Sequence, residues 1–189
     1  PSSRAKPLVV ILGPTASGKT ALAIDIAKNF NGEIICADSR TIYKSMDIGT
    51  AKPTKSEQSG IRHYGLDIIT PDKSYSAAQF KKMALTAIDD ISDRGKLPIM
   101  VGGTGLYIDG VLFDYRFLPI PNSSERDRLN KLSVEELQNE IIRKDLPMPA
   151  NKQNPRHLIR TIETRGAVPE KGKLRPNTCI IGIKTYRNV

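Results

Sequence analysis

A glycine-rich loop with a single lysine is the clearest chemical signal in the sequence. Residues 13 to 20 read Gly-Pro-Thr-Ala-Ser-Gly-Lys-Thr, which fits the pattern G-x-x-x-x-G-K-[ST]. In such a loop the backbone N–H groups surround a phosphate, Lys19 neutralises its outer oxygens and the Thr20 hydroxyl can ligate Mg²⁺. We therefore expect a pyrophosphate site made of Gly13, Pro14, Thr15, Ala16, Ser17, Gly18, Lys19 and Thr20. The loop alone fits a nucleoside triphosphate as well as the pyrophosphate of another substrate.

An acidic residue follows the next apolar run. Asp38 comes directly after Glu33-Ile-Ile-Cys-Ala37. If the sheet is wound in the usual way, this strand lies beside the strand that precedes the loop, so the carboxylate faces the phosphate. Asp38 then holds Mg²⁺, as in a kinase, or acts as a base toward an incoming nucleophile. Its third possible role is structural, as a turn cap together with Ser39.

The elements around these residues alternate between two periodicities. Residues 8 to 12, 33 to 37, 97 to 101 and 178 to 183 are short apolar runs typical of buried parallel strands. Residues 18 to 30 and 76 to 94 have the three- and four-residue apolar spacing of helices, and each ends near a glycine. The pattern predicts an α/β fold, a P-loop NTPase-like parallel sheet flanked by helices, with a small helical insertion.

The insertion begins where the composition changes. Residues 116 to 155 start with Pro119 and Pro121 and contain an acidic amphipathic helix at about residues 133 to 144. We expect a catalytic core over residues 1–115, a helical lid over 116–155 and a return to the core over 156–189 through a helix and a late strand.

The distribution of charge along the chain and the spacing of the two cysteines limit the classes of protein that fit the sequence. Residues 1 to 149 hold 20 Lys and Arg against 18 Asp and Glu, whereas residues 150 to 189 hold 9 against 2. This local excess favours a polyanionic partner, although a basic solubilising surface explains it equally well. Cys36 and Cys179 lie in apolar runs without metal-ligand spacing, so we expect two buried thiols. No apolar stretch is long enough to cross a membrane, which predicts a cytoplasmic protein.

Several longer motifs carry a family resemblance. They are the loop at residues 13–20, Asp38-Ser-Arg-Thr-Ile-Tyr43, Met46-Asp-Ile-Gly-Thr-Ala-Lys-Pro53, His63-Tyr-Gly-Leu-Asp67, Tyr75-Ser-Ala77 and Val101-Gly-Gly-Thr-Gly-Leu-Tyr107. Their order and spacing resemble those of the tRNA dimethylallyltransferase, or tRNA isopentenyltransferase, family, over about residues 7 to 187.

The resemblance implies transfer of a dimethylallyl group from dimethylallyl pyrophosphate to N6 of adenine 37, beside the anticodon of tRNA. It implies that Asp38, Thr104, Lys19 and Arg160 are catalytic, that Arg160 reaches the pyrophosphate, and that Mg²⁺ is the cofactor. The implied tRNA contacts are Asp38, Ser39, Arg40, Thr41, Thr104 and Arg126. The expected partners are the anticodon loop and the prenyl donor, with no membrane and a monomeric enzyme.

The sequence also departs from the family. Thr41, Asn154 and His157 stand where other residues are usual, and members continue well past the strand at residues 178 to 183, so we expect a C-terminally truncated member. Arg126 could be a solvated helix charge. The alternatives are an adenylate dimethylallyltransferase acting on AMP, ADP or ATP, a P-loop small-molecule kinase, and an inactive binding remnant.

Overall fold

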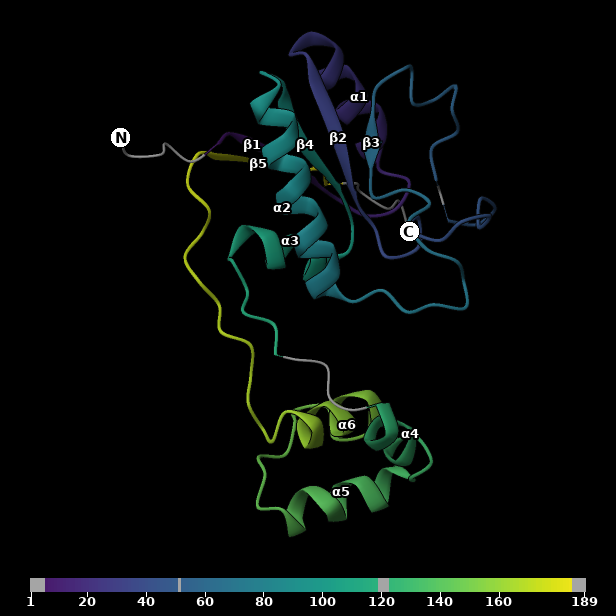
Figure 1. Ribbon diagram of the computed structural model, residues 1–189, viewed down its shortest axis with the longest axis vertical. Helices are drawn as coiled ribbons and strands as arrows, with labels where there is room; N and C mark the ends of the chain where they lie inside the picture. The colour runs from purple at the N-terminus through teal and green to yellow at the C-terminus, as the bar shows by residue number, and fades with distance from the viewer. Residues whose placement is uncertain (1–5, 51, 119–122, 185–189) are drawn as a thin grey trace. The chain divides into compact units, whose positions relative to one another are not determined.

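The chain forms two compact units in a computed structural model that describes residues 6–50, 52–118 and 123–184 (Figure 1). The first, which we call the core unit, comprises the described residues of Pro1–Tyr115 and Lys171–Val189. The second, the helical unit, is Arg116–Glu170. Each is described separately below.

A parallel sheet of five strands lies at the centre of the core unit. The strands are β1 (Leu8–Leu12), β2 (Gly32–Ala37), β3 (His63–Tyr64), β4 (Leu97–Gly102) and β5 (Thr178–Gly182), and their spatial order is β3-β2-β4-β1-β5. Every pairing is parallel. The α/β fold with a parallel sheet is therefore confirmed, and the four apolar runs expected as strands are strands.

The position of β2 differs from the expectation. We predicted that the strand ending at Asp38 lies beside the first strand, but β4 lies between them. β4 pairs along its length with β2, from Gly32 opposite Leu97 to Ala37 opposite Gly102, and its other edge pairs with β1. The central place of β4 fits its apolar run, because a strand paired at both edges is shielded from water. As a result, the turn after β4 lies between the phosphate loop and Asp38.

Helices cover both faces of this sheet (Figure 1). α1 (Lys19–Asn29) packs on one face, where Ala23, Ile24 and Ala27 meet apolar side chains of β2 and β4. α2 (Ala77–Asp93) and α3 (Gly105–Leu112) pack on the other, where the rings of Phe80 and Tyr107 stack 4.3 Å apart. The helices predicted at residues 18 to 30 and 76 to 94 are confirmed; β3 and α3 were not predicted.

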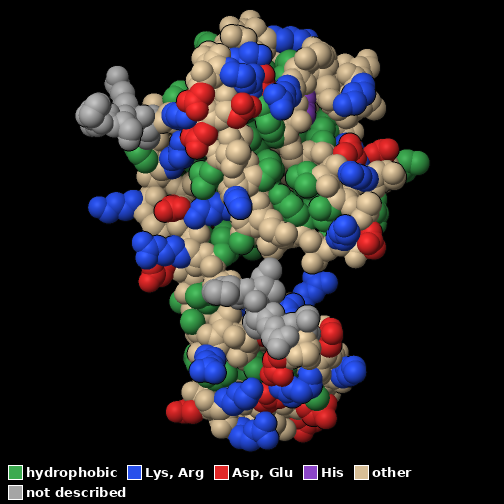
Figure 2. All heavy atoms as spheres, viewed as in Figure 1, with side chains coloured by type: hydrophobic (Ala, Val, Ile, Leu, Met, Phe, Trp, Pro, Cys, Tyr) green, Lys and Arg blue, Asp and Glu red, His purple; other side chains and the backbone are tan. Residues whose placement is uncertain are grey.

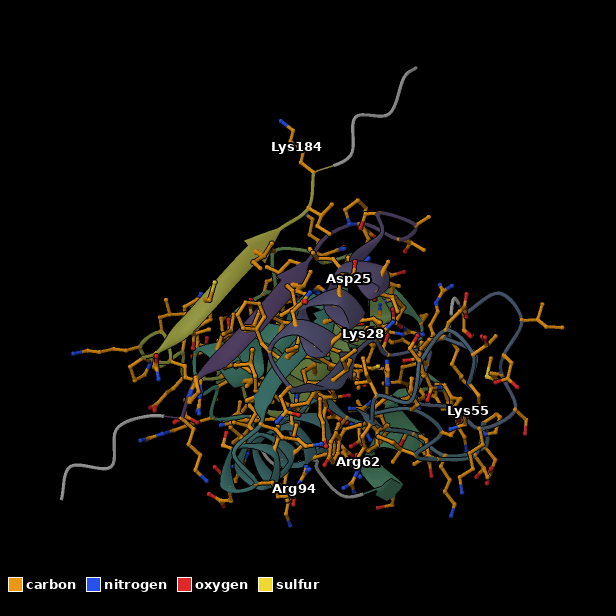
Figure 3. All side chains as sticks on the ribbon, turned by 90° about the horizontal axis from the view of Figure 1, so that it is seen from above. Asp25, Lys28, Lys55, Arg62, Arg94 and Lys184 are labelled. Atoms are coloured by element: carbon orange, nitrogen blue, oxygen red, sulfur yellow. The ribbon has the colours of Figure 1, made fainter. Side chains whose placement is uncertain are left out.

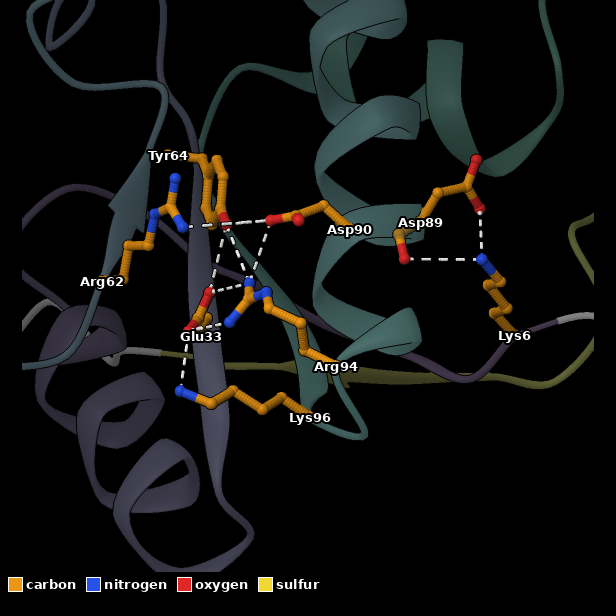
Figure 4. A network of polar contacts seen from close by, with 8 residues as sticks. All are labelled: Lys6, Glu33, Arg62, Tyr64, Asp89, Asp90, Arg94 and Lys96. Carbon is orange, nitrogen blue, oxygen red and sulfur yellow. Dashed lines mark hydrogen bonds and ion pairs between the residues drawn. The ribbon is translucent and has the colours of Figure 1, made fainter.

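A buried carboxylate joins three elements at the start of β2 (Figure 4). Glu33 is 3% exposed and accepts two hydrogen bonds from Arg94, at 2.7 and 2.6 Å, and one from Lys96 at 2.8 Å. The Tyr64 hydroxyl on β3 lies 2.6 Å from the Asp90 carboxylate on α2 and 3.2 Å from that of Glu33, and its single proton bonds to one of them at a time. The network ties the end of α2 and the start of β4 to β2.

The described residues of the helical unit form three helices around their own small core. They are α4 (Ser123–Leu129), α5 (Val134–Arg143) and α6 (Pro155–Glu163). Six buried side chains form that core: Leu129, Leu137, Ile141, Leu158, Ile159 and Ile162. Ser133 and Glu136 form a capping box at the start of α5, as expected for a helix beginning there.

The boundary of the helical unit differs from the one that we expected. We placed the return to the core unit at residue 156, whereas the compact helical unit extends to Glu170. The physical reason is the apolar face of α6, which is buried against α4 and α5 through Leu158, Ile159 and Ile162. We expected the insertion to begin at residue 116; Pro119 and Pro121, which helped to indicate that start, lie outside the described residues.

The two cysteines differ in their exposure to solvent. Cys36 is buried, as predicted, but the prediction for Cys179 was wrong: it is exposed, because β5 is an edge strand.

Among the described residues, no helix has the length and apolar character needed to cross a membrane. Lys and Arg side chains are interspersed with Asp and Glu over the face shown in Figure 2.

Candidate active site

The phosphate loop connects β1 to α1 in the expected way. Ala16 and Gly18 have φ angles of 61° and 82°, so the loop passes through two left-handed positions before the helix begins at Lys19. Lys19 Nζ donates to the carbonyl oxygen of Pro14, which holds the side chain across the loop. The N-terminus of α1 adds the positive potential that attracts an anion. The loop therefore has the shape and charge of a phosphate site.

Two opposing influences act on the Lys19 ammonium. Burial lowers the pKa of Lys19, and the negative charge of Asp38 raises it. A partly desolvated lysine is well suited to bind an anion, because the negative charge of a bound phosphate compensates for the water contacts that the ammonium has lost.

Asp38 forms a tight turn immediately after β2. Its Oδ1 accepts the backbone N–H of Arg40 at 2.8 Å, and its carbonyl accepts the Thr41 hydroxyl at 3.4 Å. The structural role considered from the sequence, a turn cap, is therefore present. The contact with Arg40 uses one oxygen of the Asp38 carboxylate and leaves the other oxygen available for a chemical role. Thr41 itself is 5% exposed.

The turn after β4 joins Asp38 to the phosphate loop. A Cβ on Gly102 would lie 2.1 Å from the carbonyl oxygen of Ala37, and one on Gly103 would lie 3.6 Å from that of Gly13. Only glycine at position 102 lets the two strands approach this closely. Thr104 then donates its backbone N–H to Ala37 at 3.2 Å, and its Oγ1 accepts the N–H of Ser39 at 2.9 Å.

One cavity of about 480 Å³ gathers most of the predicted site residues. Its walls include Thr15, Ala16, Ser17, Gly18, Lys19, Thr20, Asp38, Ser39, Arg40, Thr41 and Thr104. Gly13 and Pro14, the other two predicted residues of the loop, do not line the cavity. A phosphate-binding loop, a carboxylate and a hydroxyl thus face the same space, which is an arrangement that can hold an anionic leaving group beside a base.

One further part of the wall of this cavity was not predicted residue by residue. It is formed by Cys36, Gly49, Thr50, Pro53 and His63. Four of them lie in, or at the start of, motifs that carry the family resemblance, and that was the available signal. Burial, with the charge of Asp38, raises the pKa of the Cys36 thiol to about 12, so Cys36 is a neutral wall residue.

Lys52 holds this wall in place. Its side chain is 6% exposed, and Nζ donates to the Tyr43 carbonyl at 2.8 Å, to Asp47 at 2.7 Å and to Asp67 at 2.8 Å. The three donors of the ammonium are thereby satisfied. The contacts fasten the segment that carries Gly49 and Thr50 to the segment that follows β3.

The two predicted arginines lie in the helical unit. Arg126 forms a two-pronged ion pair with Glu163, whose side chain is fully buried, and this contact raises the pKa of Arg126. Arg126 is therefore more than a solvated helix charge. Arg160 donates to the Leu118 carbonyl at 3.0 Å and lies 3.6 Å from Glu163. Their roles toward tRNA and pyrophosphate stay predictions.

The oxygen atoms that line the cavity are suitable ligands for Mg²⁺, a cation that often takes few ligands from the protein. Thr20 and Asp38 supply hydroxyl and carboxylate oxygens on the same cavity. Within the described part of the chain, no three His, Cys, Asp or Glu side chains cluster to hold a metal. Mg²⁺ is commonly bound in this way, by one or two protein oxygens with the remaining positions filled by phosphate and water.

Known proteins resemble this chain over most of its length. The family model described as IPP transferase matches residues 41–181. A tRNA dimethylallyltransferase from Acetivibrio thermocellus is 48% identical over 163 residues, 82% of this chain and 52% of that relative. One from Anoxybacillus flavithermus is 43% identical over 193 residues, 95% of this chain and 62% of that relative.

Solved structures agree with the sequence relatives. The tRNA isopentenylpyrophosphate transferase of Bacillus halodurans matches with a TM-score of 0.64 at 36% identity, over 94% of this chain and 59% of that one. A eukaryotic dimethylallyltransferase acting on tRNA gives a TM-score of 0.74 at 27% identity, over 97% of this chain and 50% of that one. The chain spans about half the length of the curated relatives that it matches. With a family model matching most of its residues, the chain belongs to the IPP transferase family.

Proposed function

We propose that this protein transfers a dimethylallyl group from dimethylallyl pyrophosphate to N6 of adenine 37 in the anticodon loop of tRNA. The observation that carries the proposal is the single cavity shared by the phosphate loop, Asp38 and Thr104. The names of its relatives, tRNA dimethylallyltransferases, support the same chemistry. We propose that the reaction takes place in the cytoplasm, where tRNA is present.

The phosphate loop acts on the leaving group. As the bond between the allylic carbon and oxygen breaks, negative charge builds up on the departing pyrophosphate. The loop N–H groups, the N-terminus of α1 and Lys19 stabilise that charge because they are already oriented toward it. We propose that Arg160 contributes a further positive charge. Thr20 is the residue proposed to ligate Mg²⁺, which would supply additional charge stabilisation when bound.

Asp38 acts on the nucleophile. An adenine amine is weakly nucleophilic, and it loses a proton as the bond from N6 to the allylic carbon forms. We propose that the Asp38 carboxylate accepts this proton, so that one C–N bond forms, one C–O bond breaks, and pyrophosphate and a proton are released. Thr104 holds the Asp38 segment through its contact with the Ser39 N–H.

The adenine must leave its stack to reach this cavity. An amine inside a folded anticodon loop cannot align with a donor held at the base of a pocket, so the nucleotide has to turn outward. We propose that Ser39, Arg40, Thr41 and Arg126 contact the tRNA around that nucleotide. The basic residues after residue 150 support an RNA partner over free AMP.

The decisive experiment is mass spectrometry of two acceptors after incubation with dimethylallyl pyrophosphate and Mg²⁺. Unmodified tRNA and AMP are offered in separate reactions, with ATP hydrolysis measured in parallel. We expect a dimethylallyl adduct on tRNA alone. An adduct on AMP would establish an adenylate prenyltransferase instead, ATP turnover would establish a kinase-like reaction, and no adduct on either acceptor would refute the proposal for this chain.

A further inference from the structure

A buried carboxylate in the helical unit contacts both of the predicted arginines. Glu163 is the last residue of α6, and its side chain has no exposed surface, whereas those of Arg126 and Arg160 are 43% and 38% exposed. Arg126, on α4, donates from Nε and Nη2 to the two carboxylate oxygens of Glu163. Nη1 of Arg160 lies 3.6 Å from the same carboxylate. An acidic group in the interior is therefore paired with basic groups that reach the surface.

Stability alone does not account for a carboxylate at this position. Leu158, Ile159 and Ile162, earlier along the same helix, are buried in the small core of the unit. Replacing a whole buried ion pair by apolar side chains is often neutral or stabilising, because the attraction between the charges barely offsets their lost hydration. The pair therefore points to a role in the exposed part of Arg126.

The contact fixes the plane of the Arg126 guanidinium. A guanidinium carries five N–H groups in one plane, and Glu163 accepts one from Nε and one from Nη2. Two bonds to a carboxylate that is itself held in the interior leave the group little freedom to rotate. The other three N–H groups lie on the edges that face away from Glu163. They can bind a phosphate or the edge of a base without displacing the carboxylate.

The charges of this cluster still favour an anion. Two guanidinium groups share one carboxylate, so one positive charge is left over. Arg160 lies beyond hydrogen-bond distance of Glu163, so the carboxylate restrains it less firmly than Arg126. The effect of Glu163 is therefore exerted mainly through Arg126.

We propose that Glu163 is a positioning residue that holds Arg126 in the orientation in which it contacts tRNA. The inference rests on the proposed function and adds to it a residue that does not itself touch the RNA. A mobile arginine loses rotamer freedom when it binds, which lowers affinity by about 2- to 12-fold for one such side chain. Glu163 removes part of this cost before the RNA arrives.

Charge and positioning predict opposite effects for Glu163→Gln. The substitution removes a negative charge from a unit that is proposed to bind a polyanion, so charge alone predicts tighter binding of tRNA. The Gln amide has one oxygen in place of two and presents an NH₂ group to a guanidinium that has only donors. Arg126 therefore loses its two-point contact, and positioning predicts weaker binding.

Glu140 provides a matched control in the same unit. Its side chain is 6% exposed, it accepts two hydrogen bonds from Arg128, at 3.0 and 2.7 Å, and Lys144 lies 2.6 Å away. Like Glu163 it joins α4 to another helix, but neither of these partners is a predicted tRNA contact. Asp25→Asn is a control for charge, because it removes one negative charge from an exposed residue of α1, labelled in Figure 3.

The experiment measures the dissociation constant of labelled tRNA by fluorescence anisotropy, at one fixed salt concentration and without a prenyl donor. We expect Glu163→Gln to weaken binding about three- to tenfold. Glu140→Gln and Asp25→Asn should bind as tightly as wild type, or up to about threefold more tightly. Urea denaturation should show similar losses of stability for Glu163→Gln and Glu140→Gln, so that a difference in binding is not a difference in folding.

Two further variants connect the effect to Arg126. Arg126→Ala should weaken tRNA binding, and adding Glu163→Gln to it should change the affinity by less than about twofold, because the residue through which Glu163 acts is gone. Arg126→Lys keeps the charge beside Glu163, so it tests orientation even where Glu163→Gln does not fold. A lysine lacks the planar fork of arginine, and we expect at least about threefold weaker binding.

Four results would overturn the inference. Glu163→Gln binds tRNA at least as tightly as wild type; either control variant weakens binding as much; the effect of Glu163→Gln persists in full beside Arg126→Ala; or Arg126→Lys binds as wild type does. A wild-type protein without affinity for tRNA would overturn it as well.

These results are separate from the transfer assay. A protein that prenylates tRNA but gives one of the four results refutes the inference alone. A protein that shows the expected pattern of affinities but forms no prenylated adenine refutes the proposed function alone.

Discussion

The Oγ1 of Thr104 accepts the backbone N–H of Ser39 at 2.9 Å, and this bond connects the turn after β4 to the segment that carries Asp38. The Thr104 hydroxyl also points toward the Ser39 hydroxyl, 3.4 Å away. Since β4 lies between β1 and β2, the bond sets the position of Asp38 relative to the phosphate loop.

Replacing Thr104 should separate its role as a hydrogen-bond acceptor from its bulk. Thr104→Val keeps the shape of the side chain but leaves the Ser39 N–H without this partner, so we expect kcat/KM to fall roughly 10- to 100-fold, about 1.4–2.7 kcal/mol. Thr104→Ser retains the oxygen and should stay within about threefold of wild type. Steady-state kinetics with tRNA checks this, and equal losses in both variants would contradict it.

Asp38 can be tested without disturbing its turn. Asp38→Asn keeps an oxygen that can accept the Arg40 N–H, an interaction that measures 2.8 Å in the structure, but it cannot take up a proton from N6. We expect transfer to fall at least 10³-fold, while the affinity for dimethylallyl pyrophosphate changes less than about threefold. Single-turnover transfer and calorimetry measure the two effects.

Asp38→Ala provides the comparison for that prediction. It removes the turn contact as well, so it should lower both transfer and the melting temperature, whereas Asp38→Asn should lower transfer only. Transfer by Asp38→Asn at the wild-type rate would remove Asp38 from the chemistry and leave it a purely structural residue.

The sequence predicted the parts of the core that local pattern determines. The apolar runs and the G-x-x-x-x-G-K-[ST] pattern each correspond to an element at the expected residues, because burial on both faces and helix periodicity are local properties. The same is true of the helix start at Ser76, where the capping box with Gln79 is visible in the sequence.

Long-range pairing was harder to foresee. Nothing local to residues 97–102 indicates that this strand lies between β1 and β2, and two-residue β3 is too short to give a periodic signal. The exposure of Cys179 depends on which strand forms the edge of the sheet. The wall formed by Gly49, Thr50 and Pro53 depends on the buried contacts of Lys52, which join residues far apart in the sequence.

Gly102 should be intolerant of any side chain. In Gly102→Ala the new Cβ would lie 2.1 Å from the Ala37 carbonyl oxygen, so β2 and β4 must separate beside the active site. We expect a loss of at least about 2 kcal/mol in the free energy of unfolding, measured by urea denaturation. Gly105→Ala is the matched control, because a Cβ there has no neighbour within 4 Å, and it should be neutral or slightly stabilising.

The Glu33 network predicts a specific loss of stability in acid. Hydrogen bonds from Arg94, with further contributions from Lys96 and Tyr64, lower the pKa of Glu33 to about 2, against the opposing effect of burial. A carboxyl group whose folded pKa is depressed stabilises the protein above its unfolded pKa of about 4.3, and this stabilisation is lost as pH falls toward the folded value. The affected window is therefore about pH 4.5 to 2.

Glu33→Gln tests this window. The variant should be about 1–2 kcal/mol less stable at pH 7, since Arg94 and Lys96 lose their shared carboxylate. Its stability should also change less than that of wild type between pH 4.5 and 2. Urea denaturation at several pH values measures both effects, and parallel pH curves for the two proteins would contradict the assignment to Glu33.

Binding of tRNA should depend strongly on salt. The excess of Lys and Arg after residue 150 neutralises phosphates and releases their counterions, and about four such contacts would lower the affinity roughly 50-fold between 50 and 200 mM salt. Fluorescence anisotropy with labelled tRNA measures the slope of log K against log salt. Asp38→Asn changes no Lys or Arg, so the slope measured for this variant should equal that of the wild-type protein. A flat response in the wild-type protein would mean that neutral contacts, and not phosphates, carry the binding.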